Sequence, residues 1–353
     1  MSKPRERRPT LADVARLAGV SLGSASHALS TPDQVKPSTR EKVERAVEQL
    51  GYIRDGAARA LASRRTHTIA AIYPTLNNPI FAHSTESMQR TLWNLGYQLL
   101  IASHEYHADD APAVIRAAVE RGVDGLIMVG SDHGEEVYTM LHQRRLPYVL
   151  TWSTDETRYP HCVGISNFQA MYDLTQVVLD HGHRDIAVCG GYTARNERAR
   201  ARRDGVMAAM AERGLRMPQA WVLETPLSYQ AGSDAFQQLW AQPRRPTAIL
   251  FGTDLQAIGA LHQARSMGVR VPQDVSILGF DNIEEGRFMQ PSLSTIRLPA
   301  REIGQLAAER IVALIEGREP PPAEPLAHSV LLRESLGAAP APTDSAWRPP
   351  QIA

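Results

Sequence analysis

The chain has 353 residues, room for two or three domains, and its 43% hydrophobic and 22% charged content excludes a mainly disordered protein. It contains no run of about 18 apolar residues, and no apolar segment follows the arginine-rich amino terminus, which excludes a membrane-spanning helix and a secretory signal. We therefore expect a cytoplasmic protein without a membrane partner. The net charge is zero but uneven: residues 1–65 carry 13 Lys and Arg against 7 Asp and Glu, and the rest carries 25 against 31. A basic amino-terminal segment on a mildly acidic body is typical of a nucleic-acid binder with a separate sensor domain.

Two short helices are predicted near the amino terminus. Thr10 can cap the first, with Asp13 at the third position of a capping box, and Gly19 can end it in the left-handed conformation. Ser21 can then cap a second helix over residues 22–29. Two short helices joined by a glycine-containing turn form a helix-turn-helix.

A third helix is predicted to begin at a capping box over residues 38–41 and to stop at Gly51. Residues 1–53 are therefore predicted to form a DNA-binding headpiece. Its small core is expected to contain Val14, Ala15, Val20, Ala25 and Leu29.

The first residues of the second helix are the ones that enter the major groove in a helix-turn-helix. Leu22 can contact a thymine methyl group, Ser24 can bond a base or a phosphate, and His27 can donate to a guanine acceptor. Gly23 would let the backbone approach the DNA closely. The alternative for His27 is a solvated helix position. With the two caps, the predicted DNA-binding residues here are Thr10, Ser21, Leu22, Gly23, Ser24 and His27.

Residues 55–62 form an alanine-rich segment that is too short to be a stable helix alone. Such a segment can fold when a second copy of the chain and DNA supply the missing contacts. Arg59 can approach phosphates, and Leu61 can act as an apolar wedge in a minor-groove step. The alternative is an ordinary linker.

The amino-terminal segment resembles the LacI/GalR (lactose-repressor) family of bacterial transcriptional regulators. The resemblance implies a recognition helix at residues 22–29, a hinge helix at residues 55–62 within the linker 54–66, and insertion of Leu61 at the operator centre. At residues 24–27, 30 and 54–55 the sequence differs from the residues that are usual in the family, and these differences affect which operator sequence is bound. The matching stretches are TLADVARLAGVS (10–21), SHAL (26–29), TREKV (39–43), LGYI (50–53) and ARAL (58–61).

From Thr68 onward, short β-rich runs alternate with longer helical ones. Apolar strands alternating with helices indicate parallel sheets covered on both faces. Four strand–helix units precede a crossing near Val163 and four follow it, which predicts an α/β domain of two doubly wound lobes with a cleft at the carboxyl ends of the strands. The predicted strands are residues 68–73, 97–102, 125–129, 148–151, 185–189, 221–224, 247–251 and 275–278. The predicted helices are residues 79–95, 111–121, 135–145, 168–181, 197–213, 229–239, 254–267 and 301–316.

The resemblance continues through residues 67–336, as the periplasmic-binding-protein-like effector-binding and dimerising domain of the family. The tail 337–353, rich in Ala and Pro, is expected to be disordered. It has no heptad repeat, so we expect a homodimer. The matching stretches are NPIF (78–81), GVDGLI (122–127), GHRDI (182–186), GVRVP (268–272), VSILGFD (275–281) and RES (333–335).

The resemblance also implies which side chains contact an effector in the cleft. Trp152 stands where sugar binders of the family often carry Asp, and Thr253 replaces a usual Asn. Arginine offers a fork for a carboxylate or a vicinal diol, and aspartate accepts hydrogen bonds from hydroxyls. The implied effector residues are Asn78, Phe81, Trp152, Arg202, Leu227, Thr253 and Asp281.

Residues 195–203 are unusually basic. Together with the missing acid at Trp152, this favours an anionic effector, a sugar acid or other small carboxylate, over a neutral sugar. The alternative is that all but Arg202 form a solvated helix face. The arginines concerned are Arg195, Arg198, Arg200, Arg202 and Arg203.

Competing functions have weaker support in the sequence. The Gly190–Gly191 pair lacks the third glycine of a dinucleotide fingerprint, and neither a phosphate-binding loop nor a nucleophile elbow is present, so no enzyme and no cofactor are expected. The pairs His104/His107 and His181/His183 lack a third metal ligand and are expected at turns or on the surface. The two cysteines, Cys162 and Cys189, are expected to be buried thiols. The sequence thus predicts a repressor that binds double-stranded operator DNA as a homodimer under control of a small molecule; control by a protein co-effector is the alternative.

Overall fold

The computed structural model describes residues 9–53, 65–107, 109–154, 161–320 and 324–340. The chain divides into two compact units, Met1–Thr66 and His67–Ala353. Arg59 and Leu61 lie outside the described residues. No helix among the described ranges is long and apolar enough to cross a bilayer.

The amino-terminal unit contains α1 (Leu11–Ala18), α2 (Leu22–Ser30), the short 3₁₀ turn η1 (Pro32–Gln34) and α3 (Pro37–Leu50). The predicted caps are present: Thr10 and Asp13 form a reciprocal capping box, Gly19 ends α1 with φ 68°, and the Ser21 hydroxyl accepts from the Ser24 amide. The five predicted core residues pack together with further side chains, Ala18, Ala28, Val43 and Ala46.

The predicted start of α3 was wrong. The helix begins at Pro37, with Lys36 as its cap, and no side chain caps it. Proline at the first helical position has a suitable φ and no amide hydrogen to satisfy, so it starts the helix one residue before the Ser38 box could form. The Lys36 carbonyl instead accepts from the amides of Thr39 and Arg40.

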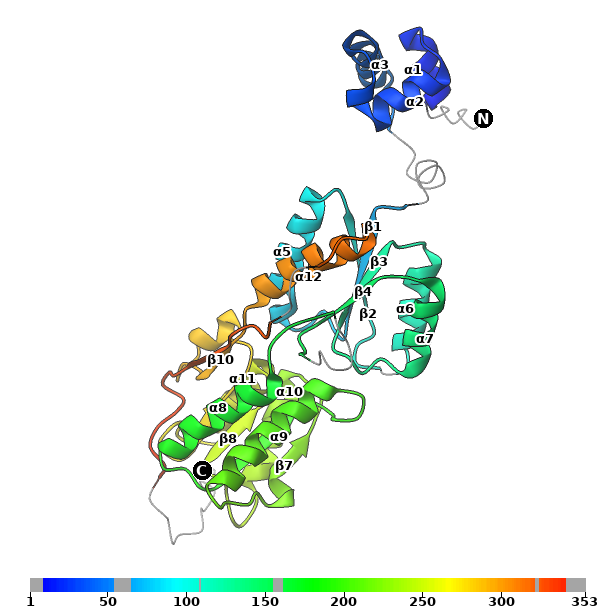
Figure 1. Ribbon diagram of the computed structural model, residues 1–353. Helices are drawn as coiled ribbons and strands as arrows, with labels where there is room; N and C mark the ends of the chain where they lie inside the picture. Colours follow the sequence, from blue (N-terminus) through cyan, green and yellow to red (C-terminus); the bar gives the residue numbers. More distant parts are fainter. Residues whose placement is uncertain (1–8, 54–64, 108, 155–160, 321–323, 341–353) are drawn as a thin grey trace, which may run out of the picture. The chain divides into compact units, whose positions relative to one another are not determined.

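The second unit is made of two lobes, each with a parallel sheet covered by helices on both faces (Figure 1). In the first lobe the strand order is β2-β1-β3-β4-β5. Helix α5 lies on one face, and α6 and α7 lie on the other. The bounds are β1 Thr68–Tyr73, α5 Pro79–Asn94, β2 Gln98–Ser103, α6 Ala111–Glu120, β3 Gly125–Val129, α7 Glu135–Arg144, β4 Tyr148–Thr151 and β5 Cys162–Val163.

The second lobe has the order β7-β6-β8-β9, with α8 and α9 on one face and α10 and α11 on the other. Two short strands that the sequence did not predict, β10 and β11, pair antiparallel beside β9. The bounds are α8 Asn167–Asp180, β6 Ile186–Gly190, α9 Glu197–Glu212, η2 Gln219–Trp221, β7 Val222–Glu224, α10 Tyr229–Trp240, β8 Ala248–Phe251, α11 Asp254–Ser266, β9 Ser276–Leu278, η3 Glu284–Arg287, β10 Thr295–Arg297, α12 Ala300–Ile315 and β11 Ser329–Leu331.

Helix α12 does not belong to the second lobe, as the four-plus-four division assumed. It packs against α5, β3 and β4 of the first lobe, where Figure 1 shows it beside α5. A Cβ atom on Gly304 would lie 2.1 Å from the Ser84 carbonyl oxygen, so glycine permits this close helix contact. The chain therefore crosses between lobes three times: after β5, before α12 and before β11.

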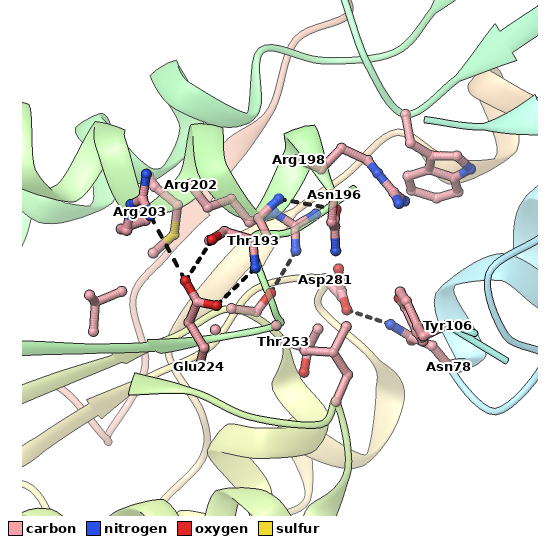
Figure 2. A pocket seen from close by; sticks show the side chains of 18 of the residues that line it. Asn78, Tyr106, Thr193, Asn196, Arg198, Arg202, Arg203, Glu224, Thr253 and Asp281 are labelled. Carbon is pink, nitrogen blue, oxygen red and sulfur yellow. Dashed lines mark hydrogen bonds and ion pairs between the residues drawn. The ribbon is translucent and has the colours of Figure 1, made fainter. Parts of the chain in front are cut away.

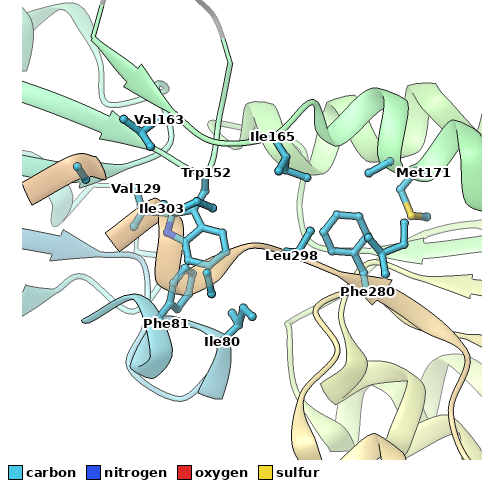
Figure 3. Close-up of a cluster of buried hydrophobic side chains, with 14 of the residues drawn as sticks. Ile80, Phe81, Val129, Trp152, Val163, Ile165, Met171, Phe280, Leu298 and Ile303 are labelled. Carbon is cyan, nitrogen blue, oxygen red and sulfur yellow. The ribbon is translucent and has the colours of Figure 1, made fainter. Parts of the chain in front are cut away.

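One hydrophobic core runs through both lobes. It contains Trp152 and Val163 of the first lobe, Phe280 of the second, and Ile165 and Leu298 on the crossing segments (Figure 3). Two separate cores fill the outer faces of the sheets, under α6 and α7 in one lobe and under α10 and α11 in the other. Movement of one lobe against the other must therefore repack the shared core.

The first four residues of the predicted disordered tail, 337–340, are instead held by the second lobe. Gly337 donates to Ser276 Oγ, its carbonyl oxygen lies 3.1 Å from His183 Nε2, and Ala339 donates to the His181 carbonyl. His183 was expected at a turn or on the surface, but it is buried because it joins this segment to Thr247 across the sheet. Residues 341–353 lie outside the described ranges.

Candidate functional site

The exposed face of α2 carries the predicted DNA-reading residues. Ala25 and Ala28 point into the core, whereas Leu22 is 54% exposed, and Gly23 and His27 are also exposed. Ser24 is half-buried, and its hydroxyl lies 2.9 Å from that of Ser21. Within about one and a half turns, the helix therefore exposes an apolar side chain, a glycine that allows close approach of the backbone, and side chains that can form hydrogen bonds.

The Thr10 side chain has a structural task. It donates to Asp13 Oδ2 at 2.7 Å and accepts from the Asp13 amide at 3.3 Å. The imidazole of His27 lies at the other end of the reading face, with Nδ1 3.5 Å from Thr31 Oγ1.

The seven predicted effector residues line a single pocket between the two lobes. Its free volume is about 50 Å³, and its walls come from residues that follow β1, β4, β6, β7, β8 and β9 (Figure 2). Parallel strands of one sheet end at the same edge, so residues distant in sequence meet there. The lining residues that the sequence analysis did not single out include Ile80, Tyr106, Thr193, Asn196 and Glu224.

Asn78 and Asp281 meet across this pocket. Asn78 Oδ1 caps α5 by accepting from the Ile80 amide, and its Nδ2 donates to Asp281 Oδ2 at 2.8 Å. Asp281 follows β9 with φ 123°, a conformation that L-residues rarely adopt and that is concentrated at functional sites. Burial raises the pKa of Asp281 to about 6, against the opposing influence of Arg202 and Asn78.

Arg202 reaches the pocket but is already held by the protein. Nε donates to Asn167 Oδ1 at 2.8 Å, Nη1 donates to the Gly252 carbonyl at 2.6 Å, and the guanidinium carbon lies 3.8 Å from the centre of the Phe280 ring. Burial lowers its pKa to about 10, so it stays charged at neutral pH. Arg202 therefore offers a ligand an oriented positive charge, since two of its guanidinium nitrogens already donate hydrogen bonds to the protein.

Three arginines line the pocket, Arg198, Arg202 and Arg203, and Arg198 lies four residues before Arg202 on the same face of α9. The Arg198 side chain is 12% exposed and forms an ion pair with Glu197 Oε1 at 3.6 Å, but its Nε is buried without a hydrogen-bond partner among the described residues. The i, i+4 spacing could have identified it from sequence. The remaining arginines of the run also pair with acids: Arg195 with Asp109, Arg200 with Asp132, and Arg203 with Asp204 and Glu224.

Aromatic and apolar side chains complete the walls. Phe81 and Trp152 make an edge-on contact with ring centres 5.3 Å apart. Trp152 has φ 65° and is buried, so an indole occupies this part of the wall. Leu227 lies against Gly191, and Thr253 caps α11 by accepting from the Gln256 amide. Cys162 and Cys189 are buried thiols, as expected.

A helix-turn-helix unit joined to a two-lobed domain with an interlobe pocket defines a ligand-responsive class of DNA-binding regulator. Residues 10–55 match the family described as bacterial regulatory proteins, lacI family, and residues 175–336 match the periplasmic binding protein-like domain. The HTH-type transcriptional repressor PurR from Escherichia coli O139:H28 is 32% identical over 315 residues, which cover 88% of this chain and 92% of the relative. The chain therefore belongs to the LacI family and is a DNA-binding transcriptional repressor.

Solved structures agree with this assignment. The transcription regulator GntR from Chromobacterium violaceum aligns with TM-score 0.70 and 31% identity, and the alignment covers 76% of this chain and 98% of that one. A complex of the transcriptional regulator CelR with cellobiose aligns with TM-score 0.69 and 27% identity, covering 93% of this chain and 100% of that one. These relatives are transcriptional regulators rather than enzymes.

Proposed function

We propose that this repressor binds a near-palindromic operator as a homodimer and responds to a small anionic effector in the interlobe pocket. The observation that carries the proposal is the pocket itself, to which both lobes contribute and across which Asn78 and Asp281 bond. Two α2 helices enter successive major grooves through Leu22, Gly23, Ser24 and His27. Paired segments 55–62 meet in the minor groove between them, with Arg59 near phosphates and Leu61 as the wedge.

The anionic character of the effector is supported by the charges in the pocket. Three arginines, Arg198, Arg202 and Arg203, line it with two acids, Asp281 and Glu224, and Arg203 pairs with Glu224. Arg198 Nε has a hydrogen bond still to make within the described structure. A buried donor without a partner costs free energy that a bound carboxylate recovers. Thr253 and Asp281 can bond hydroxyl groups, so a sugar acid or another hydroxylated carboxylate fits the set. CelR, a similar protein, is known as a complex with the sugar cellobiose.

Control of DNA binding follows from the link between the lobes. A ligand that touches both lobes favours one interlobe arrangement and repacks the shared core. It can act only through its differential affinity for the two states, and a hundredfold change in operator affinity requires about 2.7 kcal/mol of coupling. A surface for the second copy is supported by exposed apolar side chains at the end of α5 and on the edge strand β2, which are Trp93, Leu95 and Ile101.

The test combines calorimetric titration, which measures effector binding, with fluorescence anisotropy, which measures binding to promoter fragments taken from near the gene that encodes this protein. Sugar acids are compared with neutral sugars of matched stereochemistry. We expect an acid to bind and to change operator affinity, and Arg198→Gln to weaken that acid at least tenfold. Arg213→Gln is the matched control, because Arg213 follows the last turn of α9, pairs with Asp180 and does not line the pocket. Tight binding by neutral sugars alone would refute the anionic effector.

The wedge role is tested separately. Leu61→Gly should weaken specific operator binding far more than nonspecific binding, because an apolar wedge stabilises only the bent specific complex. Equal loss of both in the anisotropy assay would show that Leu61 has another role.

A further inference from the structure

A second and much larger cavity adjoins the effector pocket. Its volume is about 750 Å³, against about 50 Å³ for the inner pocket. We call it the outer chamber; it is lined by the segments that follow β1, β2 and β3 in the first lobe and β6 and β7 in the second. Of the seven proposed effector residues, only Leu227 borders it.

The two cavities share a wall. Tyr106, Gly191, Asn196, Arg198 and Leu227 line both, so Arg198 lies at the junction of the two cavities. Figure 2 shows Arg198 among the residues that line the inner pocket. A ligand whose anionic group contacts Arg198 thus has room to extend outward. The acidic unit would lie at the junction and further atoms would lie in the outer chamber.

The outer chamber is lined by aromatic and planar polar groups. Three tyrosines border it, Tyr106, Tyr192 and Tyr229, and they are 36%, 55% and 45% exposed. Rings of this kind offer an apolar face to the C–H groups of a sugar ring and a hydroxyl to its polar edge.

Two imidazoles of the outer chamber supply hydrogen-bonding nitrogens. His133 Nε2 lies 3.0 Å from the Gly130 carbonyl, to which it must donate, and this leaves Nδ1 as an acceptor. Burial lowers the pKa of His133 to about 4, so the ring is neutral at physiological pH. His104 Nδ1 is buried and has no hydrogen-bond partner among the described residues. Hydroxyl groups of a ligand can form hydrogen bonds with both Nδ1 atoms, and no further charged group is needed on the ligand.

We propose that the outer chamber is a second subsite, which takes a neutral sugar ring joined to the acidic unit at Arg198. The effector is then an acidic disaccharide, or a larger acidic saccharide, rather than a free monosaccharide acid. This inference rests on the proposed function, because it requires an anion at Arg198.

The test uses the full-length protein and three classes of ligand in calorimetric titration. Aldobionic acids (maltobionate, cellobionate and lactobionate) place a neutral ring on an acidic unit. Gluconate carries the acid alone, and maltose, cellobiose and lactose carry no acid. We expect at least one aldobionate to bind at least tenfold more tightly than gluconate and than its own neutral disaccharide, and to change operator affinity.

Tyr229→Ala provides the matching variant, since the side chain lies at the first position of α10 and is partly exposed. We expect it to weaken the aldobionate about tenfold, as lost aromatic contact would, and to leave gluconate unchanged. Phe288→Ala, an exposed ring that lines neither cavity, is the control.

Three outcomes would overturn the proposal. If gluconate binds as tightly as every aldobionate, no sugar ring contributes binding in the outer chamber, although the effector can still be anionic. If a neutral disaccharide binds as tightly as its aldobionate, the acidic group is not required for binding. No binding and no change in operator affinity with any ligand would reject the subsite together with the proposed effector class.

Discussion

The side-chain amide of Asn78 donates a 2.8 Å hydrogen bond to the carboxylate of Asp281 and so joins the start of α5 in the first lobe to the end of β9 in the second. Both side chains are buried, and the charge nearby that favours the ionised form of Asp281 is that of Arg202. The protonation of Asp281 is therefore tied to what the pocket contains.

Affinity for an acidic effector should depend on pH through Asp281. Its pKa is raised to about 6 because the carboxylate is buried, so lowering the pH from 7.5 to 5.5 protonates it and removes a negative charge from the pocket. A sugar acid, itself still ionised, should then bind more tightly at pH 5.5. Calorimetry on the wild type and on Asp281→Asn checks this: the variant should lose most of the pH dependence. Weaker binding at pH 5.5 in the wild type would contradict the assignment.

Asp254 should make the fold less stable above neutral pH. It is buried beneath the pocket, where it accepts from Thr295 Oγ1 and the Ile283 amide, and burial and nearby Asp281 raise its pKa to about 7 from 3.8. A carboxyl whose folded pKa is raised contributes stability below its unfolded pKa and loses it as pH rises through the folded value. Between pH 6 and pH 8 this group should cost about 1.4 kcal/mol. Urea unfolding at both pH values should show the fall in wild type and a smaller one in Asp254→Asn.

Gly164→Ala should destabilise the second unit by about 1–3 kcal/mol, the usual cost of overpacking. A Cβ atom there would lie 2.4 Å from the Ser153 amide nitrogen, so the crossing after β5 would have to move away from β4. Gly190→Ala is the matched control, since nothing lies within 4 Å of its added Cβ. Denaturant midpoints compare the two; equal midpoints would mean that the crossing can shift freely.

Ser21→Ala should loosen the recognition helix. The Ser21 hydroxyl is the side-chain cap of α2, and the loss of such a cap costs about 1 kcal/mol. We expect faster hydrogen exchange of the α2 amides and weaker operator binding by anisotropy. Ser30→Ala is the control, because Ser30 lies at the other end of the helix and its hydroxyl bonds only to the Ser26 carbonyl among the described residues. Unchanged exchange in Ser21→Ala would show that packing alone holds α2.

Much of the fold could be predicted because its helices and strands are marked by local sequence signals, namely apolar periodicity and capping residues. The eight predicted strands and eight predicted helices of the second unit are all present, and each of their ends differs from the prediction by one residue at most. The pocket residues could be placed because parallel strands end at a common edge and the resemblance assigned a position to each. His133 and Tyr106 escaped notice because no local pattern marks a loop residue that faces a cavity.

What could not be predicted depends on contacts between distant segments. The amphipathic pattern of α12 shows that the helix has a buried face but does not say which sheet covers it. Strands β10 and β11 have three residues each and are more than thirty residues apart, too short and too remote for a periodic signal. The order of residues 337–340 depends on His183, Thr247 and Ser276, which the composition of the tail does not reveal.

The return of α12 to the first lobe has a consequence for synthesis on the ribosome. The five strands of that lobe are complete at Val163, yet α12, which covers one face of its sheet together with α5, begins only at Ala300. At about 5–20 residues per second, translation leaves apolar side chains of α5 and β3 uncovered for on the order of ten seconds. A nascent chain at that stage should be a client of cellular chaperones until its last helix emerges.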